Sequence, residues 1–277
     1  MSALTLPPEI VDKILENIPT YKEGWPTLIA CALVATWWTG PSQRRLFSSV
    51  QIYPRNHERF VTSVILPEPK THLLGHIRSL VHYHRHDCQL RDLAQDCGEY
   101  FSALCNLHSL TCYSIEVGGI SGGGSPTYFS PFRETLTYLS LRGFTTSFSA
   151  FVTLVDYFPN ITTLWLDWFT LGPDEKPVLP LSRPLRGKLR VCEVESSCLE
   201  FFDRLAELGL EYEELVLDSH SPMKRKFVES VLRISTSTVK FLRFTRRLHR
   251  EYPLPALLTE IIPLPNPPTP KTITKAR

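Results

Sequence analysis

A glycine-rich segment around Ser121 holds residue types that could perform acyl-transfer chemistry. Residues 119–123, GISGG, satisfy the G-x-S-x-G pattern of a nucleophile elbow, but Gly124, Ser125 and Pro126 follow. That chemistry needs a strand before the serine and a helix directly after it, and this run does not start a helix. The segment also lacks the Gly-Lys-Ser/Thr ending of a phosphate-binding loop. We therefore interpret it as a loop and predict no catalytic residue.

A second chemically capable segment contains three alternating histidines. His82, His84 and His86 are followed by Asp87 and Cys88, and at period two they could share one strand face as metal ligands. However, no second cluster accompanies them, and the seven cysteines form no C-x-x-C pair. We predict no metal and no cofactor.

The composition narrows the classes of partner and compartment. The formal net charge of +2 does not point to nucleic acid or an anionic membrane. Basic residues in 224–226 and 243–250 lack an accompanying stacking platform or motif, which favours a solvated surface. No apolar run approaches the roughly 18–20 residues of a membrane helix, and Glu9, Asp12 and Glu16 interrupt any signal-peptide core. We expect no membrane partner and a cytoplasmic or nuclear location.

The first 47 residues have the pattern of three short helices. Ile10, Ile14 and Ile18 lie on one apolar face, and Pro19 ends that helix. A second helix opening at Pro26 is apolar on nearly every side and is expected to continue to the Gly40-Pro41 break, before a short segment over 44–47. So small a module cannot bury all these side chains, so a partner protein is expected to cover some of them.

The rest of the chain repeats the pattern φ-x-x-φ-x-φ, in which φ is apolar. The clearest copies are LTYLSL from Leu136 and ITTLWL from Ile161, and the copy from Leu189 uses Cys192 and Val194. The copies start at residues 47, 77, 107, 136, 161, 189, 212 and 239, with helix-like segments at 90–104, 148–157, 198–208 and 224–234. A strand and a helix repeated at this spacing are typical of a leucine-rich-repeat solenoid. An ordinary α/β domain is the alternative.

The N-terminal stretches LPPEIVDKILENI, LIACALVATWW and SQRRLFSSVQI resemble an F-box followed by leucine-rich repeats. The resemblance implies an α/β fold, with a three-helix F-box at 1–50 and a repeat domain at 51–250. The proline-rich composition of 251–277 predicts a flexible tail. It also implies docking to a Skp-family adaptor and, through it, to a cullin–RING ubiquitin ligase. The adaptor-binding residues that match the motif are Leu6, Pro7, Ile10, Ile14, Leu15, Leu28, Val34 and Trp38.

Residues between the apolar strand positions are expected to face away from the core, because strand side chains alternate. Aromatic and acidic residues gather there, and the candidate substrate-binding residues are Tyr113, Tyr138, Trp165, Asp167, Glu193, Glu195, Glu214 and Asp218. Concentrated carboxylates favour a basic partner, and Trp165 could add cation–π attraction. We therefore expect a protein substrate with a basic, extended segment. Ser140 should also face outward and be replaceable at little cost.

Three classes of function follow from these patterns. The prediction is a non-enzymatic substrate adaptor of a Skp–cullin–F-box ubiquitin ligase. The alternatives are a leucine-rich-repeat scaffold whose F-box-like helices serve a non-degradative assembly, and a hydrolase centred on Ser121. Loss of activity in Ser121→Ala would be needed to support the hydrolase.

Overall fold

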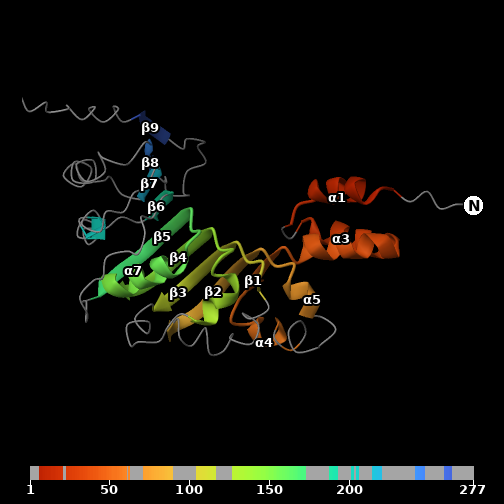
Figure 1. The fold of residues 1–277 in the computed structure, drawn as a ribbon, viewed down its shortest axis with the longest axis horizontal. Coiled ribbons are helices and arrows are strands. Elements are labelled where there is room, and N and C mark those ends of the chain that lie inside the picture. Colours follow the sequence, from red (N-terminus) through yellow and green to blue (C-terminus); the bar gives the residue numbers. More distant parts are fainter. Residues whose placement is uncertain are drawn as a thin grey trace, which may run out of the picture.

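The computed structural model describes residues 6–20, 23–60, 62, 71–89, 104–116, 127–172, 187–192, 201–202, 204–205, 214–219, 241–246 and 259–263. These residues form an α/β protein in which nine strands make one sheet. Helices α1 and α3 lie beyond the β1 end of the sheet, and the strands extend away from them in chain order (Figure 1). Over the ranges described, no helix is long and apolar enough to cross a membrane.

Three helices precede the sheet: α1 (Pro8–Glu16), α2 (Trp25–Val34) and α3 (Thr36–Leu46). Proline occupies the first turn of both α1 and α2, where a missing N–H leaves no bond unmade. Val11 and Leu15 of α1 meet Leu28 of α2 in a small buried core, against which Trp37 and Trp38 pack.

The predicted boundary between the second and third helices is wrong. α2 ends at Val34, and Ala35 is extended with φ −157° and ψ 154°. The Thr39 hydroxyl donates to the Ala32 carbonyl at 2.9 Å, which satisfies one of the last carbonyls of α2. The helix that starts at Thr36 then passes through Gly40 and Pro41. Pro41 removes one helical hydrogen bond, and the helix continues to Leu46.

The connection from α3 to the sheet is short and internally bonded. α3 ends at Leu46 and β1 begins at Ser49. The Phe47 amide donates to the Gln43 carbonyl at 2.9 Å, and the Ser48 hydroxyl donates to the Arg45 carbonyl at 2.8 Å. These bonds occupy the carbonyls at the end of the helix.

The strands follow one another across the sheet in chain order. β1 to β8 pair in parallel, and β9 pairs antiparallel to β8. Their bounds are β1 Ser49–Ile52, β2 Ser79–Gln89, β3 Ser109–Glu116, β4 Tyr138–Ser147, β5 Thr163–Gly172, β6 Lys188–Cys192, β7 Glu214–Ser219, β8 Phe241–Arg246 and β9 Thr259–Pro263. Leu80, Leu110, Leu139 and Leu164 are in register, as their positions in the sequence pattern predict.

The predicted alignment of β6 is wrong by three residues. Leu189 and Val191 lie opposite Leu164 and Leu166, where the sequence pattern places Cys192 and Val194. The Lys188 amide donates to the Thr162 carbonyl at 2.8 Å, the position at which each preceding strand also begins. Gly187 makes this start possible, because its φ of +148° suits glycine alone.

One sheet face carries the main core. The inward leucines pack with phenylalanines from the connections, including Phe129, Phe132, Phe158 and Phe201. Helix α7 (Phe148–Tyr157) spans the residues predicted for it, and its N-cap Ser147 accepts a bond from the Ala150 amide. Short helices α4 (His57–Phe60), α5 (Thr71–Leu74) and η4 (Thr127–Phe132) lie in other connections, and residues 201–202 and 204–205 are helical within the helix predicted at 198–208. Of the predicted helix at 90–104 only Leu104 is described, and the predicted helix at 224–234 lies outside the described residues.

The region predicted to be a flexible tail includes a strand. Residues 259–263 form β9, which pairs with β8 from Thr259↔Thr245 to Pro263↔Phe241. Thr259, Ile261 and Ile262 are β-branched and suit a strand, and Pro263 stands at its end, where proline is tolerated.

β4 and β5 bend at the same register position. Gly143 has φ +59° and Trp168 has φ +53°, and each directly follows one of the paired residues Arg142 and Asp167. Beyond these residues the inward positions of both strands shift by one residue, so that Phe144 and Phe169 are buried. Their rings stack with centroids 5.6 Å apart. Glycine adopts this conformation freely, whereas a tryptophan there is strained. Trp168 is 64% exposed, so core packing does not explain its strain.

Candidate functional site

The sheet face opposite the leucine core, called here the outer face, carries a continuous stack of aromatic and guanidinium groups. Tyr83 lies between Tyr53 and Tyr113, with ring centroids 4.4 Å and 4.2 Å away and planes within 15° of parallel. Parallel pairing in register produces this stack, because Tyr83 and Tyr113 occupy equivalent positions on neighbouring strands. Both faces of the Tyr83 ring are therefore covered.

The stack continues through Arg142 and Trp165 to Arg190. The Arg142 guanidinium lies 5.1 Å from the Tyr113 ring centroid and 4.2 Å from that of Trp165, and it donates to the Tyr113 hydroxyl at 2.8 Å. Arg190, from the strand on the other side, lies 4.1 Å from the Trp165 ring. Trp165 therefore has a guanidinium on each face, and its π-system is already engaged.

The outer face carries more positive charge than the sequence predicted. In the true register of β6, Lys188 and Arg190 occupy its outward positions, opposite Thr163 and Trp165. The predicted acidic residues Glu193 and Glu195 lie outside the described residues. Asp167 is buried beside Arg142 at 4.0 Å, and Glu214 pairs with Lys188 at 2.8 Å. Asp218 is in register with Cys192, and its side chain is outside the described set.

Ser140 points to the outer face as predicted, but it is fully buried. It accepts a bond from Arg142 Nε at 3.4 Å and lies opposite Trp165 in the pairing. The large side chains beside it cover it. Because Ser140 is buried and hydrogen-bonded, we expect its replacement to carry a cost, unlike the neutral replacement expected from the sequence.

Burial affects the tyrosines of the outer face. It raises the pKa of Tyr83 well above its ordinary 10.0, and the neighbouring Tyr113 raises it further. Burial also raises the pKa of Tyr138, against the lowering effects of the Ser140 hydrogen bond and nearby Arg142 and Arg190. These phenols keep their protons at neutral pH and can donate hydrogen bonds.

The predicted adaptor-binding residues divide into two groups. Leu15 (2% exposed) and Leu28 belong to the small helical core, and Trp38 packs against it. The other predicted residues are exposed: Leu6, Pro7, Ile10, Ile14 and Val34.

Three exposed apolar residues of α2 were missed by the motif. Trp25, Ile29 and Leu33 are exposed, Leu33 by 82%. Ile29 and Leu33 are four residues apart and so share one side of the helix. The sequence indicated that some of these side chains would be exposed, because this helix is apolar on nearly every side and cannot bury all of them. Together with the exposed predicted residues other than Pro7, they form what we call the apolar helix surface: Leu6, Ile10, Ile14, Trp25, Ile29, Leu33 and Val34.

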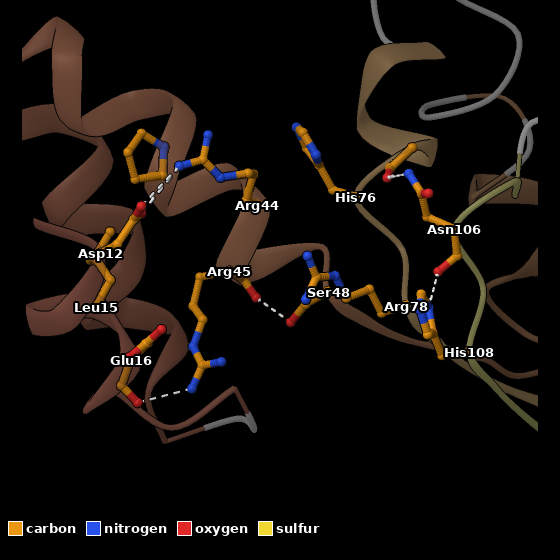
Figure 2. A pocket seen from close by; sticks show the side chains of 12 residues that line it. Asp12, Leu15, Glu16, Arg44, Arg45, Ser48, His76, Arg78, Asn106 and His108 are labelled. Atoms are coloured by element: carbon orange, nitrogen blue, oxygen red, sulfur yellow. Dashed lines mark hydrogen bonds and ion pairs between the residues drawn. The ribbon is translucent and has the colours of Figure 1, made fainter. Parts of the chain in front are cut away.

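A cavity of about 400 Å³ lies where the helices meet the sheet (Figure 2). Arg44, Arg45 and Arg78 line it together with Asp12 and Glu16. Within the helices, Arg44 pairs with Asp12 at 3.1 Å and Arg45 donates to the Glu16 carbonyl at 3.0 Å (Figure 2). The Ser48 hydroxyl at this cavity donates to the Arg45 carbonyl at 2.8 Å (Figure 2). These contacts hold α1 to α3 next to the first strand.

Of the catalytic and metal-binding candidates, only His82 has a described side chain. His82 is buried at an inward position opposite Ile52 and Cys112. Among the residues described, no group of three or more His, Cys, Asp or Glu side chains could hold a metal ion. Ser121 and the glycines around it lie outside the described residues.

Comparisons with known proteins identify no family for this chain. No protein-family model matches it, and no curated protein sequence matches it.

Proposed function

We propose that the chain is a substrate adaptor of a Skp–cullin–F-box ubiquitin ligase. In this proposal the N-terminal helices form an F-box that docks a Skp-family adaptor, and the sheet is the strand side of a leucine-rich-repeat array. The outer face holds a protein substrate. Ubiquitin transfer is performed by other subunits, and this chain supplies proximity.

The observation that carries the proposal is the apolar helix surface. Of the eight large apolar side chains exposed among the described residues, seven lie between residues 6 and 34, and Trp168 is the eighth. Apolar side chains gathered in so short a segment are typical of a protein-docking surface. The underlying core of Val11, Leu15 and Leu28 is separate from these side chains, so the helices can fold while the surface stays available.

The sheet gives independent support for a repeat array. Successive strands pair in parallel and in chain order, and equivalent leucines lie opposite one another. Each connection returns the chain to the same end of the sheet, as stacked strand-and-connection units do. Side chains also join neighbouring units: Asn106 donates to the Gly75 carbonyl at 2.8 Å, and Asn160 to the Glu134 carbonyl at 2.6 Å.

The docking test uses exposed positions, so that folding and binding can be separated. Ile10→Asp combined with Ile14→Asp should lower affinity for a purified Skp-family adaptor by at least about 30-fold, because each places a charge in an apolar contact. The free energy of unfolding should change little, since both side chains are exposed. Binding would be measured by titration calorimetry and stability by urea unfolding.

Lys13→Asp is the matched control on the same helix. Lys13 is exposed and the change adds negative charge without removing an apolar contact, so it should leave binding within about 3-fold. Undiminished adaptor binding by the Ile10/Ile14 variant would contradict the proposal. Capture of the adaptor from cells without cullin would favour the non-degradative scaffold instead.

A further inference from the structure

Among the described residues of the outer face, the stacked rings of Tyr83, Tyr113 and Trp165 present no open face to a basic partner. Tyr83 is covered by two tyrosines, Tyr113 by Tyr83 and Arg142, and Trp165 by two guanidiniums. A cation can bind an aromatic ring only over its face, where the quadrupole is negative. The basic substrate expected from the sequence therefore loses the cation–π attraction that Trp165 was expected to add to the carboxylates.

The stack instead presents groups that attract anions. Rings stacked from strand to strand have their edges directed away from the sheet, and an aromatic edge is electropositive. Tyr83 and Tyr138 are protonated at neutral pH, as a phenol with the ordinary pKa of 10.0 already is, and burial raises their pKa further. A guanidinium stacked by its face can donate in its plane, as Arg142 does to the Tyr113 and Ser140 hydroxyls, and its five N–H donors are more than these two bonds use.

The positive charges of the outer face gather around Trp165. The outward positions of β4 to β6 carry Arg142, Lys188 and Arg190 against Asp167, and Glu214 and Asp218 at outward positions of β7 balance the remaining charge. Arg142 and Arg190 bracket a single indole and repel each other. An anion at the solvent-facing edge of the Trp165 ring, between the two guanidiniums, would interact favourably with both.

We propose that this part of the outer face binds an extended acidic protein segment, with Arg142, Trp165 and Arg190 at its centre. This inference names the substrate class within the proposed function and rests on that function for its biological meaning. The Arg142 and Arg190 guanidiniums lie 4.2 Å and 4.1 Å from the Trp165 ring centroid, so they are at most about 8 Å apart, and carboxylates two residues apart on one side of an extended chain are separated by about 7 Å. Two acidic residues of one segment can therefore reach both guanidiniums.

The test measures direct binding of labelled peptides to the purified full chain by fluorescence anisotropy, without any ligase subunit. Three extended peptides of equal length would carry Glu, Gln or Lys at the same alternate positions. The Glu peptide should bind at least about 10-fold more tightly than the Gln peptide at low salt, and more weakly as salt rises. The Lys peptide should bind no better than the Gln peptide.

Arg190→Gln should lower affinity for the Glu peptide about 10-fold. Arg133→Gln is the matched control, because Arg133 also stacks on a ring, that of Tyr157 at 5.2 Å, but lies in the η4 connection. Arg190→Lys keeps the charge and loses the planar fork, so it should fall between wild type and Arg190→Gln. Urea unfolding of each variant identifies losses caused by misfolding, and the comparison of peptides on the unmodified chain tests the proposal without any substitution.

Preference for the Lys peptide, or equal effects of Arg190→Gln and Arg133→Gln, would overturn the inference. Selective binding of the Glu peptide by a chain that fails to bind a Skp-family adaptor would support the acidic-segment site and refute the ligase role. Adaptor binding without any peptide preference would support the ligase role and refute the acidic-segment site.

Discussion

Gly187→Ala tests the register of β6, on which the charge of the outer face depends. Gly187 has φ +148°, and a Cβ added there would lie 2.2 Å from the Thr162 carbonyl oxygen and 2.9 Å from its carbon. Backbone atoms on a neighbouring strand cannot move aside as a flexible side chain can. The substitution must therefore displace the start of β6 or strain it.

The size of the effect follows from three contributions. A side chain in this backbone region costs on the order of 1–3 kcal/mol. Displacement of β6 also weakens the bond from the Lys188 amide to the Thr162 carbonyl, which contributes about 0.5–1.5 kcal/mol. Alanine restricts the unfolded chain and returns roughly 0.4–1 kcal/mol. The free energy of unfolding should therefore fall by about 1–3 kcal/mol.

Gly172→Ala is the matched control, measured by the same urea unfolding followed through tryptophan fluorescence. Its added Cβ would meet the Thr146 carbonyl oxygen at an ordinary 3.8 Å. Stability should stay unchanged or rise by up to about 1 kcal/mol. Equal stability of the two variants would refute the reasoning, because Gly187 would then not lie against Thr162. The alternative alignment with Cys192 and Val194 would be restored, together with the acidic outer face.

Other substitutions and conditions test separate features. Leu15→Ala should lower the free energy of unfolding of the helices by about 2–5 kcal/mol, while Ile14→Ala should change it by less than about 0.5 kcal/mol, as circular dichroism melts would report. Trp168→Gly should stabilise the chain by about 1 kcal/mol in urea unfolding by relieving its φ of +53°; a loss would mean that the indole has a packing role. Ser140→Ala should cost about 1 kcal/mol rather than nothing, because its buried hydroxyl accepts a hydrogen bond. The folded-state pKa of Tyr83 is raised, so its stabilising contribution is complete below pH 10 and is lost at higher pH; unfolding measured from pH 8 to 11 should show this decline, and Tyr83→Phe should weaken it.

The strand pattern could be predicted where apolar residues fit only one alignment. The segments LTYLSL and ITTLWL each have only one alignment that places apolar residues inward, and Leu139 and Leu164 lie opposite each other as expected. The segment from Leu189 contains Val191, Cys192 and Val194, so two alignments have apolar residues at inward positions. The choice depends on the backbone angle of Gly187 and on its contact with Thr162, neither of which the pattern contains.

The site was predicted in its residue types but not in its contacts. Tyr113 and Trp165 were placed on the outer face by alternation alone. Their stacking with Arg142 and Arg190 depends on the register of three successive strands, so one misaligned strand exchanged arginine for glutamate. On α1, Leu15 was grouped with the docking residues because its side of the helix is defined by packing against other helices, which helical periodicity does not identify.

The two-residue connection between α3 and β1 also constrains how the molecule could work. A flexible tether lets the surfaces on its two sides sample many separations, which lowers their mutual effective concentration as the tether lengthens. Phe47 and Ser48 are instead hydrogen-bonded to α3, so the connection leaves little freedom for α3 to move relative to β1. In a ligase assembly, a substrate on the sheet would be presented at a fixed range and angle from the docked helices. The lysine of the substrate that is modified would then be selected by its position, because only lysines at a suitable distance and direction from the docked helices could be reached.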